Sequence, residues 1–294
     1  NPTGPLHVGH ARGAIYGSAL ANILETAGYA VQREYYVNDA GNQMSLFSES
    51  LFARYCQLFK EDISIPEDGY RGEYMIDLAK EIRDKEQDRF LNLPKEDAIR
   101  GIGTIGLDKM LNVIKNDLAN VGVWFDNWFS EKSLYEEGQY DKSMDLLRLK
   151  GFITERDGAI WFTSTSLGED KDNVLVRSTG VPTYFASDVA YHYNKFIERK
   201  FDRVINVWGA DHQGHISRMK AVMTAIDRSP DTLTLTITQI VTFKRGDETV
   251  RMSKRSGDII TLRELVSEVG PDACRFFFLS RSPESQMEFD MKLA

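Results

Sequence analysis

Cysteine is scarce in this sequence, long apolar runs are lacking, and positive charge is not in excess. The chain of 294 residues has two cysteines, Cys56 and Cys274, without a C-x-x-C spacing, which argues against a disulfide framework or a thiolate zinc site. No apolar run approaches the roughly 18 residues that a membrane helix needs, and residues 1–6 lack a signal pattern. Acidic residues outnumber basic ones by 44 to 36. These absences favour a cytoplasmic protein without a membrane segment, in which any contact with nucleic acid is local.

The hydrophobic periodicity predicts an α/β fold whose first strand is missing. Apolar residues recur at helical spacing from His10 to Ala27, and Val31–Val37 has the pattern of a strand. A glycine-containing turn, a helix and a strand make half of a βαβ unit, whose first strand would precede Asn1. The chain also lacks an initial methionine. We therefore expect a fragment, or a chain numbered from an internal point.

An inserted region is expected between two halves of the α/β core. Three glycines weaken its last predicted helix by about 1 kcal/mol each relative to alanine, and Asp157-Gly158 is typical of a hairpin turn in a small antiparallel sheet. Alternating helices and strands return after Pro182, as in a parallel sheet. The predicted parts are the first half of the core at 1–60, the inserted region at 61–183, the second half at 184–282, and a link to an absent domain at 283–294.

Four of the five histidines form two H-x-x-H pairs, His7 with His10 and His212 with His215. Each pair could simply share a helix face, or could hold zinc or iron together with a carboxylate. The first pair, however, opens a predicted helix after a turn rich in proline and glycine, where free N–H groups favour phosphate. Gly9 would let a nucleotide approach closely. Imidazole donors there could stabilise an α-phosphate as its charge grows, which indicates nucleotidyl transfer.

A second signal is the basic segment R-M-S-K-R at residues 251–255, followed by Ser256 and Gly257. Such a cluster is usually a solvated surface. Its place after the last strand of a nucleotide-binding half favours another role, because a short basic loop can close over a triphosphate and neutralise the leaving pyrophosphate.

The motifs H-V-G-H and R-M-S-K-R, in this order and across an inserted block, resemble the two signature motifs of class I aminoacyl-tRNA synthetases. N-P-T-G-P-L-H-V-G-H at residues 1–10 and V-N-D-A-G-N-Q at residues 37–43 resemble arginyl-tRNA synthetases in particular. The resemblance implies a Rossmann-like parallel-sheet nucleotide-binding core split by a helical and small antiparallel-sheet insertion. The family's basic motif commonly has Lys first and Ser fifth, whereas this chain has Arg251 and Arg255.

The resemblance also implies an activity and its partners. The enzyme would be an arginine-tRNA ligase that uses ATP with Mg²⁺, binds arginine and tRNA(Arg), and works as a monomer in the cytoplasm. Activation of arginine would itself require tRNA. Two domains of the family, an N-terminal tRNA-binding domain and a helical anticodon-binding domain, are expected outside this chain, so the chain alone could be inactive.

The implied site residues fall into three groups, and no metal-ligating residue is among them. A guanidinium group binds well to carboxylate oxygens and to a flat apolar or aromatic surface. Tyr184 and Asp188 are four residues apart at the start of a predicted helix, so they could share one face. The resemblance assigns catalysis to His7, His10 and Lys254. It assigns ATP binding to His7, Gly9, His10, Arg251, Ser253, Lys254 and Arg255, and arginine binding to Asn1, Asp39, Tyr184, Asp188 and Gln213.

Three other functions stay open at this point. Another class I synthetase is the nearest alternative. A synthetase-like module that binds nucleotide or amino acid without catalysis is the second. A metal-dependent hydrolase built on the two H-x-x-H pairs is a weaker third.

Overall fold

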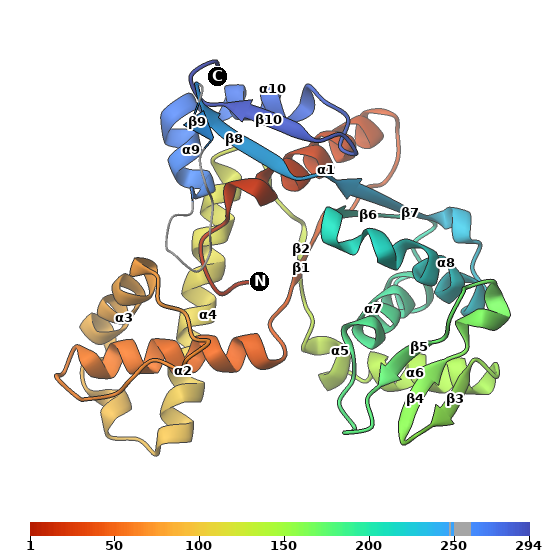
Figure 1. Cartoon of the computed structure of the whole chain (residues 1–294), viewed down its shortest axis with the longest axis horizontal. Helices are drawn as coiled ribbons and strands as arrows, with labels where there is room; N and C mark the ends of the chain where they lie inside the picture. The colour runs from red at the N-terminus through yellow and green to blue at the C-terminus, as the bar shows by residue number, and fades with distance from the viewer. Residues whose placement is uncertain (247, 250–259) are drawn as a thin grey trace. The chain divides into compact units, whose positions relative to one another are not determined.

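The computed structural model describes residues 1–246, 248–249 and 260–294 (Figure 1). The described residues form two compact units, each around its own hydrophobic core. Unit 1 comprises Asn1–Trp128, Val241–Ser282 and Gln286–Ala294, and unit 2 comprises Phe129–Ile240 and Pro283–Ser285. Helices alternate with short strands in both units, which confirms the predicted α/β class.

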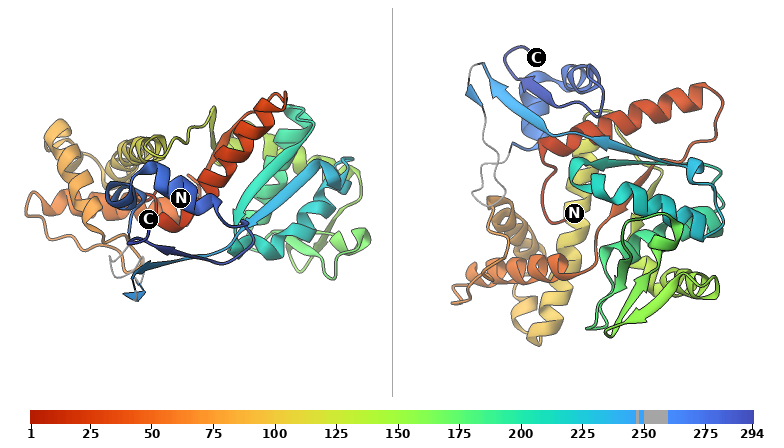
Figure 2. Two further views of the ribbon diagram at one scale, coloured as in Figure 1. Left: turned by 90° about the horizontal axis from the view of Figure 1, so that it is seen from above. Right: turned by 45° about the vertical axis from the view of Figure 1, so that its right-hand side comes forward.

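Unit 1 is mostly helical and contains a few short strands. Strand β8 pairs in parallel with β10 and antiparallel with β9, and β1 pairs with β2 (Figure 2). Its helices are α1 (Val8–Thr26), α2 (Asn42–Gln57), α3 (Glu73–Glu86), η1 (Arg89–Leu91), α4 (Lys95–Ala119), α9 (Leu262–Val269) and α10 (Pro271–Leu279). Its strands are β1 (Glu34–Val37), β2 (Asn127–Ser130, which runs into unit 2), β8 (Val241–Arg245), β9 (Glu248–Thr249) and β10 (Met287–Asp290).

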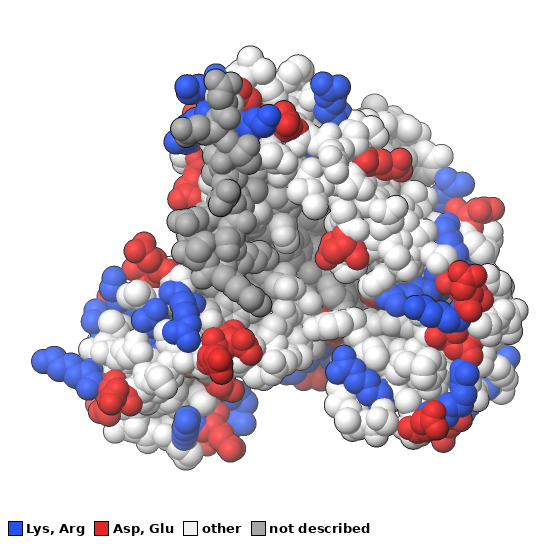
Figure 3. Space-filling model, in the orientation of Figure 1, with Lys and Arg blue, Asp and Glu red and all other residues white. Residues whose placement is uncertain are grey.

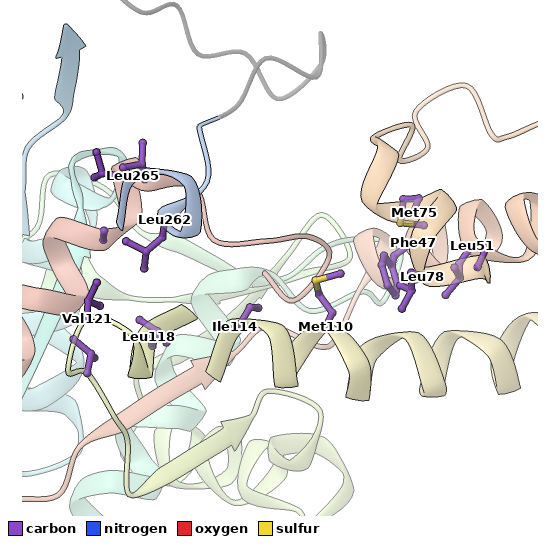
Figure 4. Packing of buried hydrophobic residues seen from close by; sticks show 14 of the residues in the cluster. Phe47, Leu51, Met75, Leu78, Met110, Ile114, Leu118, Val121, Leu262 and Leu265 are labelled. Atoms are coloured by element: carbon purple, nitrogen blue, oxygen red, sulfur yellow. The ribbon is translucent and has the colours of Figure 1, made fainter. Parts of the chain in front are cut away.

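Helix α4 runs through the hydrophobic core of unit 1. Its buried residues Met110, Ile114 and Leu118 recur at every fourth position and so form one apolar stripe. Figure 4 shows the two ends of this stripe covered by different helices, α2 and α3 at one end and α9 at the other. The helix thereby joins residues from the start and the end of the sequence in one core.

Two of the glycines that weaken α4 in isolation have a packing role. A Cβ added to Gly103 would lie 2.1 Å from Ser48 Oγ, and one added to Gly106 would lie 2.3 Å from Leu51 Cδ2. Both contacts are with α2, so the missing side chains allow the two helices to approach closely. The propensity cost is therefore offset by helix packing.

Unit 2 contains a parallel strand pair and a separate antiparallel sheet. Strands β6 and β7 pair in parallel, and β3-β4-β5 is antiparallel as predicted, with Asp157 and Gly158 both in the left-handed region at the β3–β4 turn. The strands are β3 (Ile153–Arg156), β4 (Ala159–Phe162), β5 (Asn173–Val176), β6 (Val204–Gly209) and β7 (Leu233–Thr238). The helices are α5 (Ser133–Glu136), α6 (Gln139–Leu149), η2 (Ser164–Leu167), α7 (Tyr184–Tyr193), η3 (Asn194–Glu198, a π-helix), η4 (Ala210–His215), α8 (Ile216–Ala225) and η5 (Pro230–Thr232).

Surface charge is mixed. On the face drawn in Figure 3, acidic and basic side chains are interspersed, so this face shows no broad field of one sign. Within the described residues, no helix combines the length and apolar character that crossing a bilayer requires.

Candidate active site

His7 caps the N-terminus of α1 with its own side chain. Its Nδ1 atom accepts a hydrogen bond of 2.9 Å from the backbone N–H of Gly9. Because Nδ1 accepts, the neutral imidazole carries its proton on Nε2, an atom that can donate to an anion. The ring of exposed His10 lies edge-on to that of His7, with 5.8 Å between the centroids. The predicted pair therefore lies together at a helix N-terminus, where the helix dipole favours phosphate.

Backbone pairing joins the His7 segment to the chain that follows the basic segment. His7 and Thr261 form an antiparallel bridge, and the N–H of Val8 donates to the carbonyl of Ile260 at 3.1 Å. Thr261 is in turn the N-cap of α9, with a reciprocal capping box to Glu264. Two segments at opposite ends of the sequence are thus fixed to each other within unit 1.

The predicted phosphate-binding residues of the basic segment, Arg251, Ser253, Lys254 and Arg255, lie outside the described residues. Along the sequence, this segment continues into Ile260, which is anchored beside Val8. The assignments of these four side chains stay predictions.

Tyr74 of α3 holds the N-terminal turn. Its hydroxyl donates a hydrogen bond of 2.8 Å to the carbonyl of Thr3, and a Cβ added to Gly4 would lie 3.2 Å from the Tyr74 ring. Thr3 is buried, whereas Asn1, which is predicted to contact the amino-acid head group, is exposed. A helix of the predicted inserted region therefore fixes the turn that carries Asn1.

Asp39 lies just beyond the end of β1 and is partly buried. Its backbone N–H donates to the carbonyl of Val37 at 3.0 Å, and the side-chain amide of Gln43 donates to the carbonyl of Asn38, also at 3.0 Å. These bonds fix the backbone on both sides of the strand end. Asp39 therefore belongs to the same unit as His7, and its predicted role in arginine binding remains a prediction.

Helix α7 carries Tyr184 and Asp188. Thr183 caps the helix, because its hydroxyl accepts from the N–H of Ala186 at 3.4 Å. Tyr184 and Asp188 lie one turn apart, as their spacing predicts. Their surroundings differ, since Tyr184 is 65% exposed and Asp188 is partly buried.

Burial dominates the electrostatics of Asp188. Loss of hydration, together with the negative charge of Glu131, raises its pKa to about 7, although Arg218 and Lys195 act in the opposite direction. The Arg218 guanidinium lies 4.8 Å from the centroid of the Phe185 ring, and burial lowers its pKa. Two carboxylates and two cations therefore share one poorly solvated region. Bringing a planar cation to these carboxylates would relieve their mutual repulsion.

Glu131 was missed by the sequence reasoning. It directly follows β2 and is only 4% exposed. Because acidic residues are rarely buried, an interior glutamate whose charge acts on Asp188 is a candidate site residue. The one local signal was its position after the aromatic run from Trp124 to Phe129, which predicts a half-buried strand.

The second histidine pair packs with an aromatic residue. The Trp208 ring centroid lies 5.6 Å from that of His212 and 6.5 Å from that of His215, and burial lowers the pKa of His215. Gln213, the predicted pocket glutamine, is exposed between them on η4. Among the residues that the structure describes, no three His, Cys, Asp or Glu side chains are arranged to hold a metal ion. The metal-hydrolase alternative therefore gains no support from them.

The predicted site residues are divided between the two units. Unit 1 contains Asn1, His7, Gly9, His10 and Asp39, and unit 2 contains Tyr184, Asp188 and Gln213. The structure brings the first histidine pair together, and it places Asp188 where the charge of Glu131 acts on it. The chemical roles of all these residues remain predictions.

The sequence matches known proteins over its whole length. Residues 1–277 match the family model described as tRNA synthetases class I (R), catalytic domain. Arginine-tRNA ligases from Dehalococcoides mccartyi strain BAV1 and Syntrophotalea carbinolica are 59% and 54% identical over 294 residues. All of this chain is covered in both cases, and it spans 53% of each relative's length.

Solved structures give the same result. A provisionally named arginyl-tRNA synthetase from Campylobacter jejuni superposes with a TM-score of 0.90 at 38% identity, over 99% of this chain and 63% of that one. The Thermus thermophilus arginyl-tRNA synthetase shares the fold, with a TM-score of 0.76 at 20% identity over 99% of this chain and 58% of that one. With its histidine segment, its α/β units and its matching relatives, the chain belongs to the class I tRNA synthetase family for arginine, within the part that forms the catalytic domain.

Proposed function

We propose that the protein carrying this chain is an arginine-tRNA ligase. In the first step an oxygen of the arginine carboxylate attacks the α-phosphorus of ATP, the bond to the bridging oxygen breaks, and pyrophosphate leaves. In the second step a hydroxyl of the terminal adenosine of tRNA(Arg) loses its proton to water and attacks the activated carbonyl, the bond from that carbonyl to the phosphate oxygen breaks, and AMP leaves. Both steps conserve charge and atoms without a redox partner.

The observation that carries this proposal is the pair of poorly hydrated carboxylates in unit 2, Glu131 and Asp188. Glu131 is 4% exposed, and its charge disfavours ionisation of Asp188. A guanidinium stays charged at any ordinary pH and can donate to two carboxylates at once. Arginine is therefore the amino acid whose side chain best matches this site. Tyr184, Gln213, Asp39 and Asn1 complete the proposed arginine-binding set.

The proposed ATP site uses the N-terminus of α1. His7 and His10 would donate to the α-phosphate as charge develops there, an interaction that is strongest in the transition state. Gly9 would let the nucleotide approach, and Arg251, Ser253, Lys254 and Arg255 would bind the leaving phosphates. Mg²⁺ would arrive bound to ATP and would neutralise part of the phosphate charge, and we treat it as part of that substrate.

The family resemblance supports further parts of the proposal. Residues 61–183 would be the inserted connective region, arginine activation would need tRNA, and the enzyme would act as a cytoplasmic monomer. The molar mass of the full-length protein, measured by light scattering, would test whether it is a monomer.

The direct experiment is ATP–pyrophosphate exchange by the full-length protein that carries this sequence. It is run with total tRNA and each of the twenty amino acids in turn. Exchange that depends on arginine alone is the expected result. Exchange with a different amino acid would identify another class I synthetase, and no exchange with any would favour a non-catalytic binding module.

A further inference from the structure

A buried lysine, Lys195, lies next to the proposed arginine site and has no part in the function described so far. It belongs to η3, which continues directly from α7, and it is 6% exposed. Burying an ammonium group is costly unless charges and hydrogen bonds compensate it. The surroundings of Lys195 therefore need an explanation.

The side chains of Asn206 and Tyr191 contact the lysine ammonium. Its Nζ atom donates a hydrogen bond of 2.9 Å to Oδ1 of Asn206 on β6, and Nζ lies 3.7 Å from the centroid of the Tyr191 ring. The Asn206 amide continues the network, because its Nδ2 lies 2.8 Å from Nε2 of His192. Asn206 is 9% exposed and His192 is 1% exposed, so the network is enclosed.

The same network ends on the backbone of Asp188. Since Nε2 of His192 accepts from Asn206, Nδ1 carries the proton and donates to the carbonyl of Asp188 at 2.7 Å. Burial, followed by the charge of Lys195, lowers the pKa of His192 well below its ordinary value, which keeps this tautomer neutral. Asp188, His192 and Lys195 follow one another at i, i+4 and i+7, so they lie along one side of the continuous helix.

We propose that Lys195 is a positioning residue for the arginine site: its buried ammonium, fixed by Asn206 and Tyr191, keeps the Asp188 carboxylate in the ionised form that a guanidinium requires. This inference rests on the proposed function. The groups that act on Asp188 come from several elements. Glu131, after β2, opposes its ionisation, and Arg218 on α8 and Lys195 on η3 favour it. The charge of Asp188 in turn helps to raise the pKa of Tyr135 on α5, after the larger effect of burial.

The alternative is that Lys195 only braces η3 against β6. Two substitutions separate the roles. Lys195→Gln keeps a donor for Asn206 and removes the charge, and Lys195→Met removes both. Lys142→Met is the matched control, because Lys142 pairs with Glu198 on the surface of the same unit and its removal changes the net charge equally.

The measurement is the pH dependence of the arginine KM in pyrophosphate exchange by the full-length protein with tRNA. Removing the ammonium should raise the pH midpoint of this profile by about one unit, the smaller end of the effect of a close opposite charge. At about pH 6 the arginine KM of both Lys195 variants should then exceed that of the wild type about tenfold, and at about pH 8.5 the difference should be less than about twofold. The kcat and the ATP KM should change less than about twofold.

The possible outcomes are distinct. A Lys195→Gln profile that superimposes on that of the wild type would overturn the inference and leave a bracing role, whether or not Lys195→Met folds. A shift of equal size in Lys142→Met would also overturn it, because the effect would then come from overall charge. Failure of the wild-type protein to use arginine would reject the proposed function instead.

Discussion

The imidazole of His7 and the backbone N–H of Gly9 form a 2.9 Å hydrogen bond that closes the first turn of α1. This bond sets the orientation of a ring that we propose contacts ATP. It also depends on the absence of a side chain at Gly9, since a Cβ there would lie 2.9 Å from the accepting nitrogen.

Gly9→Ala should therefore separate stability from activity. Loss of the cap should destabilise the helix by about 1 kcal/mol, and the higher helix propensity of alanine should stabilise it by about 1 kcal/mol. The free energy of unfolding should therefore change little. Adenylate formation should fall about tenfold or more, because the displaced ring no longer meets the phosphate. Denaturant unfolding and pyrophosphate exchange measure the two effects. Full activity of the alanine variant would show that the ring position is unimportant.

His10→Ala should lower kcat by about 100-fold, the loss typical of removing one transition-state donor. Both KM values should stay nearly constant, because the proposed bond strengthens mainly in the transition state. Steady-state kinetics of the full-length protein test this. If the variant loses ATP affinity at full kcat, His10 contributes to ground-state binding.

Tyr74→Phe removes the hydrogen bond to the carbonyl of Thr3 and little else. We expect a stability loss of about 1 kcal/mol and a higher arginine KM, because the turn that carries Asn1 is held less firmly. Tyr70→Phe is a matched control, since no hydrogen bond of the Tyr70 hydroxyl is present within the described part of the chain. Equal effects of the two substitutions would argue against the specific role of the Thr3 bond.

Asp188→Asn should change how stability depends on pH. The pKa of Asp188 rises from 3.8 to about 7 on folding, so the proton stabilises the folded state at low pH, and this contribution is lost as the pH rises toward 7. The asparagine variant does not lose this stability, because its side chain does not ionise. Its advantage in free energy of unfolding should grow between about pH 4 and pH 7, by up to about 4 kcal/mol, and then level off.

Denaturant unfolding of both proteins across this pH range gives the comparison. His192, whose lowered pKa acts in the opposite direction, is present in both and cancels. Asp145→Asn on the exposed surface of α6 controls for the loss of one carboxylate. A difference that does not vary with pH would mean that Asp188 is well hydrated. In the full-length enzyme, the same Asp188→Asn change should also raise the arginine KM with little effect on the ATP KM.

Lys254→Ala should slow adenylate formation by about 100-fold or more, whereas Arg251→Lys should be nearly silent. A compact ammonium can follow the charge that moves onto the leaving pyrophosphate. Single-turnover pyrophosphate release with cognate tRNA present is the measurement. A fast Lys254→Ala variant beside a slow Arg251→Lys variant would reverse the two assignments.

Sequence patterns predicted the elements that depend on local chemistry. Asp157-Gly158 forms the expected hairpin turn because both residues tolerate positive φ. The helix that the histidine pair opens begins at Val8, close to the predicted start at His10. Helix α6 was not predicted, because its residues lie in a stretch whose aromatic and β-branched runs indicated a sheet.

Contacts between residues far apart along the chain could not be predicted from sequence patterns. Neither Glu131 nor Asn206 stands near Asp188 along the chain, and only tertiary folding buries them close to α7 or its continuation. The sequence predicted that the glycines of α4 weaken this helix locally. Their benefit came from α2, whose approach the spacing of the glycines did not reveal.

The bridge between His7 and Thr261 has a further consequence for how the family can vary in length. It closes a loop of about 250 residues, and the entropy of closing such a loop grows only with the logarithm of its length, about 0.6 kcal/mol for each doubling. Whole segments could therefore be gained or lost between the two ends without disturbing their pairing. The bridge makes the pairing of His7 with Thr261 independent of the number of residues that lie between them.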